Sequence, residues 1–348
     1  MKNFLLLILF LCSIKHINAI NYKLTSIFQN TQTLANFSQW TGKDQTTDLF
    51  YTDWCEKSSD FVFNVVLVNM WNNKTIPLIT WMMQGCGSSG PPGITKLVNQ
   101  GIYDGYINEF SDHLKEWLAG NDNIYGNEDD RRAYLRLAHE MNGNWSPYSL
   151  NATPTDFVLA WRRVYRIFAS KNLDPTRLQW MWSVNNVDVG EYTAEEYWVG
   201  DDYTDWVGID GYNFGPSQKW HTWIWPNQVF DNMTARVRQL SPNKPLAYNE
   251  YGCTSIISAE GVSNITMKTE WLNQFCDYIN KNSVKLATYF NIEKETDWAI
   301  YGGQRGDTIW NGVKVYTAYK DCLQTNDWIQ PNSTNPRLIT DDQFAGRI

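Results

Sequence analysis

Short apolar runs that end in polar or aromatic residues alternate along the chain with longer amphipathic segments. The short runs predict strands, which we place at residues 48–54, 76–85, 132–143, 177–186, 205–215, 244–252 and 284–293. Apolar residues at helical spacing predict helices over residues 104–120, 155–171 and 270–280. An eighth strand is expected near residues 101–108, and the apolar segment 61–71 is either a further strand or the first helix.

Strands that alternate with helices over about 300 residues indicate a parallel sheet, and at this length a closed (β/α)8 barrel is the favoured form. We therefore expect the α/β class, with one TIM-barrel catalytic domain over residues 20–348.

The first residues have the pattern of a secretory signal peptide. Lys2 precedes an apolar run from Phe4 to Cys12, which is too short to span a bilayer. Cleavage after Ala19 would remove residues 1–19 as a leader and give a secreted protein. A signal anchor is the alternative interpretation.

Charge and aromatic content narrow the choice of partner. The chain has a formal net charge of −8, and the leader holds two lysines and no acid, so the mature chain carries −10. Such an acidic chain argues against nucleic acid and anionic membranes as partners. Its 18 tryptophans suit stacking against sugar rings, although tryptophan also fills protein cores.

Five cysteines remain after the leader, at positions 55, 86, 253, 276 and 322. In a secreted chain they predict at most two disulfides and one free thiol, with the pairing left open. Glycosylation sequons occur at Asn36, Asn73, Asn144, Asn151, Asn232, Asn264 and Asn332. We expect Asn144 to be bare, because it lies inside a polar strand-end motif and precedes Trp145-Ser146-Pro147.

That motif is RLAHEMNGNW, residues 136–145. Because side chains alternate along a strand, Arg136 and Glu140 are expected to point into the barrel, with Glu140 at the carboxyl-terminal rim where barrel enzymes hold their catalytic groups. His139 would lie on the other face and orient a neighbour by a hydrogen bond.

Two later strands end in the same way. In PLAYNEYG, Leu246, Tyr248 and Glu250 are predicted to share one face, and in WVGIDGYNF, Asp210 and Tyr212 align likewise. Two glutamates and an Asp/Tyr pair can thus converge on one barrel mouth.

Paired carboxylates across a sugar linkage are the groups that glycoside hydrolysis needs. One carboxylic acid protonates the leaving oxygen, and the other, ionised, attacks the anomeric carbon at a separation of about 5–5.5 Å. Arg136 would lower the pKa of a neighbouring carboxyl group and help one glutamate stay ionised. The alternative is that both glutamates are merely solvated or paired with a cation.

A zinc site and other metals are not expected, and neither is a cofactor. Metalloproteases need H-E-x-x-H on a helix, whereas the residue four positions after His139 is Gly143 and the segment is predicted as a strand.

At these residues the chain resembles glycoside hydrolase family 26, the β-mannanase family of retaining (β/α)8-barrel enzymes. The matching pieces occur in order between Pro77 and Trp298: PLITW, GIYDGYINEFSDHLK, LRLAHEMNGNWSPY, FVLAWRRVYRIF, LQWMWSVN, VGIDGYNF, NEYG and YFNIEKETDW.

The resemblance implies roles for individual residues. Glu140 would be the acid/base, Glu250 the nucleophile, and Tyr212 a contact of the nucleophile. The residues it implies as substrate-binding or supporting groups are His139, Arg136, Asn142, Trp145, Asp210, Tyr212 and Tyr289.

Departures from the family pattern touch the sugar-binding surface. Met82-Met83 stands where a polar group is common, and Tyr148 and Tyr289 stand where tryptophan is common. The implied activity is a secreted, metal-independent, retaining endo-β-1,4-mannanase, acting as a monomer on a β-mannan-type polysaccharide. Mixed-linkage β-glucan and β-1,3-xylan are alternative substrates, and a non-catalytic carbohydrate-binding barrel is the alternative of a different class.

Overall fold

A computed structural model describes residues 21–29, 34–55, 59–86 and 90–347. The predicted leader, residues 1–19, lies outside the described residues. None of the described helices is both long enough and apolar enough to cross a membrane.

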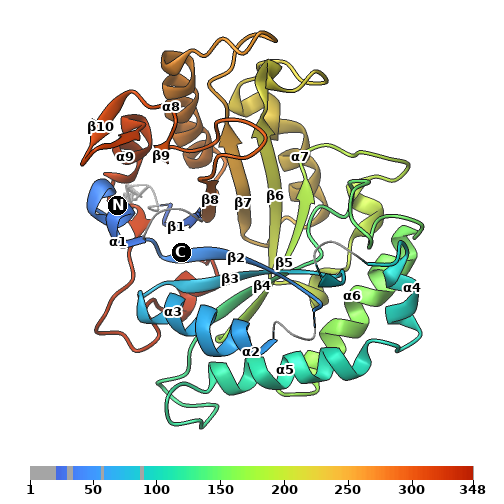
Figure 1. The fold of residues 1–348 in the computed structure, drawn as a ribbon. Coiled ribbons are helices and arrows are strands. Elements are labelled where there is room, and N and C mark those ends of the chain that lie inside the picture. The colour runs from blue at the N-terminus through green and yellow to red at the C-terminus, as the bar shows by residue number, and fades with distance from the viewer. Residues whose placement is uncertain (1–20, 30–33, 56–58, 87–89, 348) are drawn as a thin grey trace, which may run out of the picture.

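Eight parallel strands form a closed barrel, because each pairs with the next and β1 pairs with β8 (Figure 1). They are β1 (Lys23–Phe28), β2 (Thr47–Asp53), β3 (Ile76–Met82), β4 (Ala133–Leu137), β5 (Leu178–Asn185), β6 (Trp206–Asn213), β7 (Leu246–Cys253) and β8 (Leu286–Phe290). The predicted (β/α)8 TIM barrel is confirmed.

Helices surround the barrel (Figure 1). They are α1 (Leu34–Thr41), α2 (Ser59–Phe61), α3 (Leu67–Asn72), α4 (Ile94–Asn99), α5 (Asp104–Leu118), α6 (Pro154–Ala169), α7 (Pro226–Leu240), α8 (Ile265–Lys281), α9 (Thr317–Leu323) and α10 (Asp341–Phe344). A short π-helical segment, Val62–Val66, joins α2 to α3, so the ambiguous segment 61–71 is helical. The chain also forms β12 (Trp328–Ile329) beside β1 and a small sheet of β9 (Tyr301–Gly303), β10 (Thr308–Trp310) and β11 (Val313–Val315).

The seven strands predicted from apolar runs are confirmed, but the eighth was misplaced. Residues 104–108 open helix α5, and the eighth strand is β1, with the sequence KLTSIF. Three polar residues dilute its apolar pattern, yet Lys23, Thr25 and Ser26 are all buried. Lys23 is accommodated because its ammonium group pairs with Asp327.

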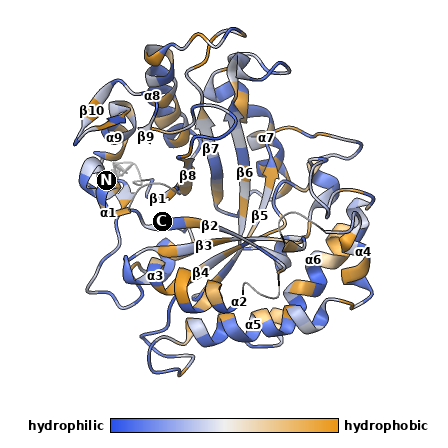
Figure 2. Ribbon diagram, viewed as in Figure 1, coloured by the Kyte–Doolittle hydropathy of each residue, from blue (hydrophilic) through white to orange (hydrophobic). Residues whose placement is uncertain are grey.

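Local sequence explains the clearest helix. Thr153 and Asp156 form a capping box at the start of α6, and Pro154 occupies the first turn. Apolar residues along one side then pack toward the sheet. Figure 2 shows apolar residues along the strands and on parts of α5 and α6, between stretches of polar residues.

The barrel interior has an apolar end and a polar end. Leu49, Leu78, Tyr134, Met181 and Trp206 fill the amino-terminal half, where the carboxyl-terminal segment covers them with Leu338, Ile339 and Phe344. The other end, at the carboxyl termini of the strands, therefore remains as the mouth where polar groups can meet.

The prediction of two disulfides and one free thiol is also confirmed. Disulfides join Cys55 to Cys86 and Cys276 to Cys322, and Cys253 is a buried free thiol.

Candidate active site

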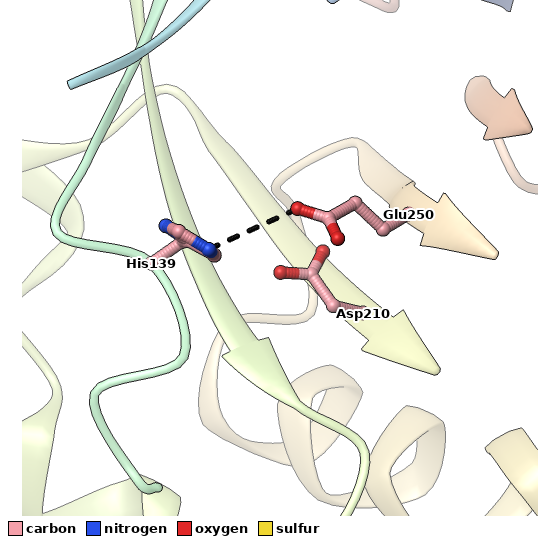
Figure 3. A group of neighbouring side chains, drawn as sticks. All are labelled: His139, Asp210 and Glu250. Atoms are coloured by element: carbon pink, nitrogen blue, oxygen red, sulfur yellow. Dashed lines mark ion pairs between the residues drawn. The ribbon is translucent and has the colours of Figure 1, made fainter. Parts of the chain in front are cut away.

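Acidic and aromatic side chains converge on the carboxyl-terminal ends of β4, β6 and β7. Figure 3 shows His139, Asp210 and Glu250, which come from three different segments and point toward one another. Side-chain oxygen or nitrogen atoms of the three lie within 4.8 Å of one another. Strand β6 follows the predicted alternation, with Asp210 inside the barrel and Tyr212 at the mouth.

Arg136 links the two carboxylates of this group. Its Nη1 donates to both oxygens of Asp210, at 3.0 and 2.9 Å, and its Nη2 pairs with Oε1 of Glu250. Its Nε donates to Oγ1 of Thr80 on β3 at 2.9 Å. Arg136 is fully buried, as predicted for an inward side chain of β4, and this one cation faces two acids.

Glu250 is held as a carboxylate. Burial is the largest single influence and by itself would raise its pKa, but the positive charges of Arg136 and His139 and the hydrogen bonds from Tyr212 and Tyr51 together outweigh it. Tyr212 donates its hydroxyl to Oε2 of Glu250 at 2.6 Å. The pKa of Glu250 falls to about 2, so the group is ionised at neutral pH.

Glu140 has the opposite tendency. Burial and the negative charge of Glu250 raise its pKa to about 8, against the opposing effects of Arg136 and of a hydrogen bond from Trp145. That bond runs from the indole Nε1 of Trp145 to Oε2 of Glu140 at 3.1 Å. Glu140 is thus protonated at neutral pH.

Asp210 shares the cation with Glu250. Burial raises the pKa of Asp210 above its ordinary value, and the charge of Glu250 adds to this while Arg136 opposes it. Ser183 on β5 also donates a hydrogen bond to Asp210, at 3.1 Å.

The backbone leaves strand geometry just before Glu140. Ala138 and Glu140 adopt positive φ angles of 42° and 53°, which non-glycine residues rarely do. Tertiary hydrogen bonds fix this shape: the amide of Ala138 donates to the carbonyl of Trp81, and that of Glu140 to the carbonyl of Ser183.

Because of this turn, the predicted position of His139 is wrong. Simple alternation placed it on the helix-facing side, but the positive φ of Ala138 rotates it into the mouth, where Nε2 lies 3.9 Å from Oε1 of Glu250 (Figure 3). Burial and the neighbouring Arg136 lower the pKa of His139 to about 3. The imidazole is therefore neutral at neutral pH, where Arg136 is the cation in contact with Glu250.

Strand β7 also departs from alternation. Tyr248 packs on Phe230 of α7, on the helix side, so the prediction that it shares a face with Glu250 is wrong. The pairing of β6 with β7 shifts by one residue between Ile209 and Asp210, which leaves Asn249 as the extra residue of a β-bulge. Asn249 points inward to Ser183, and the bulge turns Glu250 inward as well.

The side chains of His139, Asp210 and Glu250 could bind a metal ion only in competition with Arg136. His139, Asp210 and Glu250 form the one metal-capable group found among the described residues. The guanidinium already occupies both oxygens of Asp210 and one of Glu250. A divalent ion would have to displace a buried positive charge, so these residues do not fit a metal centre.

Two of the expected substrate-binding residues are buried in supporting positions. Asn142 is hydrogen-bonded to the loop after β5, through Asn185 and Asp188. Tyr289 is fully buried on the helix side, where its hydroxyl donates to the carbonyl of Trp298. The strand-end aromatic residue that faces the mouth is its neighbour Phe290, which packs with Tyr212.

Trp145 does line the mouth, since its side chain is 47% exposed beside Glu140. Sequence reasoning missed Tyr51 on β2, whose ring lies 5.7 Å from the guanidinium of Arg136 and whose hydroxyl bonds to Glu250. Alternation within the predicted strand 48–54 could have found it, because Leu49 and Tyr51 share the inward face.

Comparison with known proteins agrees with this geometry. The profile of glycosyl hydrolase family 26 matches residues 128–302, which include both glutamates. Endoglucanase H of Acetivibrio thermocellus is 31% identical over 241 residues, covering 66% of this chain and 23% of that protein. A β-1,3-xylanase of an Alcaligenes species is 26% identical over 266 residues, covering 71% of this chain and 50% of that protein.

Solved structures match the fold over most of the chain. A family 26 β-mannanase from Bacteroides ovatus aligns with a TM-score of 0.60 at 14% identity, covering 89% of this chain and 90% of that one. A modular endo-β-1,4-mannanase from Cellulomonas fimi aligns with a TM-score of 0.61 at 12% identity, covering 92% of this chain and 73% of that one. The chain spans only 23% and 50% of the length of the two curated relatives named above.

Proposed function

Because the chain belongs to glycosyl hydrolase family 26, we propose that it hydrolyses a β-linked polysaccharide with retention of configuration. The observation that carries the proposal is the pair of glutamates at one barrel mouth, with the pKa of Glu140 raised to about 8 and that of Glu250 lowered to about 2. In glycosidases, the acid/base and the nucleophile are carboxyl groups whose environments separate their pKa values in this way.

In the first step, the Glu250 carboxylate attacks the anomeric carbon while Glu140 gives its proton to the leaving sugar oxygen. The glycosidic bond breaks, and the sugar is held as an ester of Glu250. In the second step, Glu140 is now a carboxylate and takes a proton from water, which attacks the same carbon and releases Glu250. Two inversions at one carbon give net retention.

Neighbouring side chains stabilise each glutamate in the charge state that its role requires. Arg136 and Tyr212 stabilise the charge of Glu250 before attack and after its release. Trp145 stabilises the Glu140 carboxylate that forms after proton transfer, because its indole N–H is already directed at Oε2. Neutral His139 adds no second cation that would hold Glu250 back from the anomeric carbon.

For the substrate we propose an internal linkage of β-1,4-mannan, on the strength of the HEMNG.W and KETDW motifs. A second candidate is β-glucan, because a relative that is 31% identical is named an endoglucanase. β-1,3-Xylan follows, from the relatives that are 26% identical. Digestion of mannan, galactomannan, mixed-linkage glucan and β-1,3-xylan side by side, with product profiles, separates these substrates.

We further propose that the protein is secreted after removal of residues 1–19 and acts as a monomer. The leader pattern and the two disulfides support export to an oxidising compartment. Amino-terminal sequencing of the protein recovered from culture medium, together with its mass in solution, tests both points.

The catalytic roles are tested with two glutamate variants. Glu250→Ala should lower turnover by about 10⁴-fold or more, since no nucleophile remains. Glu140→Ala should lose much less on aryl glycosides with good leaving groups than on polysaccharide, because only poor leaving groups need the proton. Glu128→Ala, an exposed acid on the loop before β4, is the matched control.

Proton NMR of the first product released by the wild-type enzyme should show the β anomer. An initial α anomer, or near-native turnover by Glu250→Ala, would contradict the assignment. Binding of polysaccharide without any release of reducing ends would instead support the non-catalytic barrel.

A further inference from the structure

Trp220 is an exposed tryptophan close to the candidate active site. It lies in the loop that follows β6, which also holds Trp223 and Trp225. Its side chain is 70% exposed, the highest value among the large apolar side chains of the described residues. An indole ring in water is unremarkable when isolated, so its surroundings decide whether it has a role.

Trp220 is the last of a series of aromatic rings whose first member, Tyr212, contacts Glu250. Tyr212, which donates a hydrogen bond to Glu250, lies 5.6 Å from Phe214 between ring centroids. Phe214 lies 4.9 Å from Trp220. Trp298 packs against two of these rings, with its ring centroid 5.0 Å from that of Tyr212 and 4.8 Å from that of Phe214. Trp220 is therefore the solvent-exposed end of an aromatic surface that starts at a catalytic carboxylate.

The loop that presents Trp220 is fixed at both ends. The side-chain oxygen of buried Asn213 accepts hydrogen bonds from the amides of Gly215 and Ile224, at 3.1 and 3.2 Å. Gly215 has a φ of 51°, and a side chain there would meet the carbonyl of Ile256 at 2.5 Å, so the turn requires glycine. A loop whose ends are already fixed loses little backbone entropy when it binds a ligand.

We propose that Trp220, backed by Phe214, is a platform for a sugar ring of the bound polysaccharide outside the ring whose bond is cleaved. The apolar C–H face of a pyranose suits the flat indole, and the polar edges of the sugar stay in water. The occupant is a neutral β-linked glycan several units long. The inference rests on the proposed function, because it places this glycan at the same barrel mouth.

The first test measures binding without catalysis. Native gels that contain the polysaccharide are run with Glu250→Ala and with Glu250→Ala/Trp220→Ala, so that no digestion occurs during the run. Loss of the aromatic contact should raise the apparent dissociation constant about tenfold. Glu250→Ala/Trp220→Phe should restore part of the retardation, since it keeps a flat ring.

The second test compares substrates of different length. Trp220→Ala should raise KM for polysaccharide far more than kcat falls, and the loss in kcat/KM should be larger for polysaccharide than for a short aryl glycoside. The control is Ile124→Ala, which removes a side chain that is 62% exposed on a loop at the opposite end of the barrel.

Two results would overturn the platform: gel retardation of Glu250→Ala/Trp220→Ala equal to that of Glu250→Ala, or the same loss on short and long substrates. Failure of the proposed function gives a different pattern, in which the wild-type enzyme releases no reducing ends from any of the polysaccharides. In that case the gel assay still decides whether Trp220 binds glycan.

Discussion

The side chains of Glu140 and Glu250 are chemically identical, and their neighbours make them different. Glu250 accepts hydrogen bonds from the guanidinium of Arg136 and the hydroxyl of Tyr212, and both favour its charged form. No cation of the described residues forms an ion pair with Glu140, and its hydrogen bond from Trp145 only partly offsets burial and the charge of Glu250. The fixed charge of Arg136 on one partner therefore decides which glutamate keeps the proton.

A change at Trp145 should shift the alkaline limb of the pH–rate profile. Activity needs protonated Glu140, so kcat/KM should fall as pH rises through about 8. The indole N–H of Trp145 favours the ionised form of Glu140 and so lowers its pKa. In Trp145→Phe that hydrogen bond is lost, the pKa rises, and the alkaline limb should move to higher pH.

The control for this shift is Trp220→Phe, which changes an indole near the same barrel mouth that packs on Phe214 and His221. Its alkaline limb should stay in place whatever happens to KM. An alkaline limb of Trp145→Phe that is unchanged, or displaced to lower pH, would rule out the assigned hydrogen bond as a determinant of the pKa of Glu140.

At the scale of strands and helices, the sequence pattern predicts the barrel, but it does not predict which way every side chain at the strand ends points. Alternation is correct for Arg136, Asp210 and Tyr212, which lie within regular parts of β4 and β6. It fails at His139, after the positive φ of Ala138, and at Tyr248, before the bulge at Asn249. Both irregularities are held by contacts with neighbouring strands, which no local residue preference reveals.

The missed strand β1 has a similar cause. Its buried polar residues are acceptable only because distant parts of the chain meet them, as Asp327 meets Lys23. The helices were easier to predict, because capping and amphipathic spacing are local properties of the sequence. Tertiary partners thus account for most of what the sequence pattern left unpredicted.

A buried lysine of helix α8 holds the segment that follows β8. The ammonium group of Lys268 donates to the carbonyls of Asp297, Trp298 and Ala299, at 2.5, 3.0 and 3.1 Å. These residues follow β8, and Trp298 supports Tyr212 and the aromatic platform. Lys268→Met should lower the free energy of unfolding by about 3 kcal/mol, since it leaves three carbonyls without their donor.

Urea unfolding measures that loss, and Lys281→Met, an exposed lysine of the same helix, is the matched control. Below the unfolding transition, kcat of the Lys268→Met variant should also fall, because Trp298 no longer holds Tyr212 against Glu250. A stable variant with wild-type kcat would show that the loop keeps its shape without the lysine.

At the scale of the whole molecule, the barrel is closed at one end and open at the other. The carboxyl-terminal segment covers the amino-terminal end, where Tyr134 donates to the carbonyl of Phe344 at 2.8 Å and Arg132 pairs with Asp341. The catalytic groups and exposed tryptophans occupy the open end. The Cys276–Cys322 disulfide fastens α8 to α9, the last helix before this carboxyl-terminal segment.

Removal of that disulfide should affect stability far more than chemistry. It joins cysteines 46 residues apart, and in the chain-entropy description such a loop stabilises the fold by about 4 kcal/mol through the unfolded state. Cys276→Ala/Cys322→Ala should lose about that much free energy of unfolding in urea, yet keep wild-type kcat at 25 °C. Activity should persist because Phe275 and Tyr319 still pack in the core between helices and barrel.

Cys253→Ala is the control that removes a buried sulfur without removing a cross-link, and it should cost about 1 kcal/mol. Because the entropy term grows only with the logarithm of loop length, Cys55→Ala/Cys86→Ala, with a separation of 31 residues, should lose nearly as much. A loss below 1 kcal/mol for the Cys276/Cys322 pair would mean that packing alone fixes α9. In that case, reduction of the Cys55→Ala/Cys86→Ala variant, in which Cys276–Cys322 is the remaining disulfide, should hardly shift its unfolding midpoint.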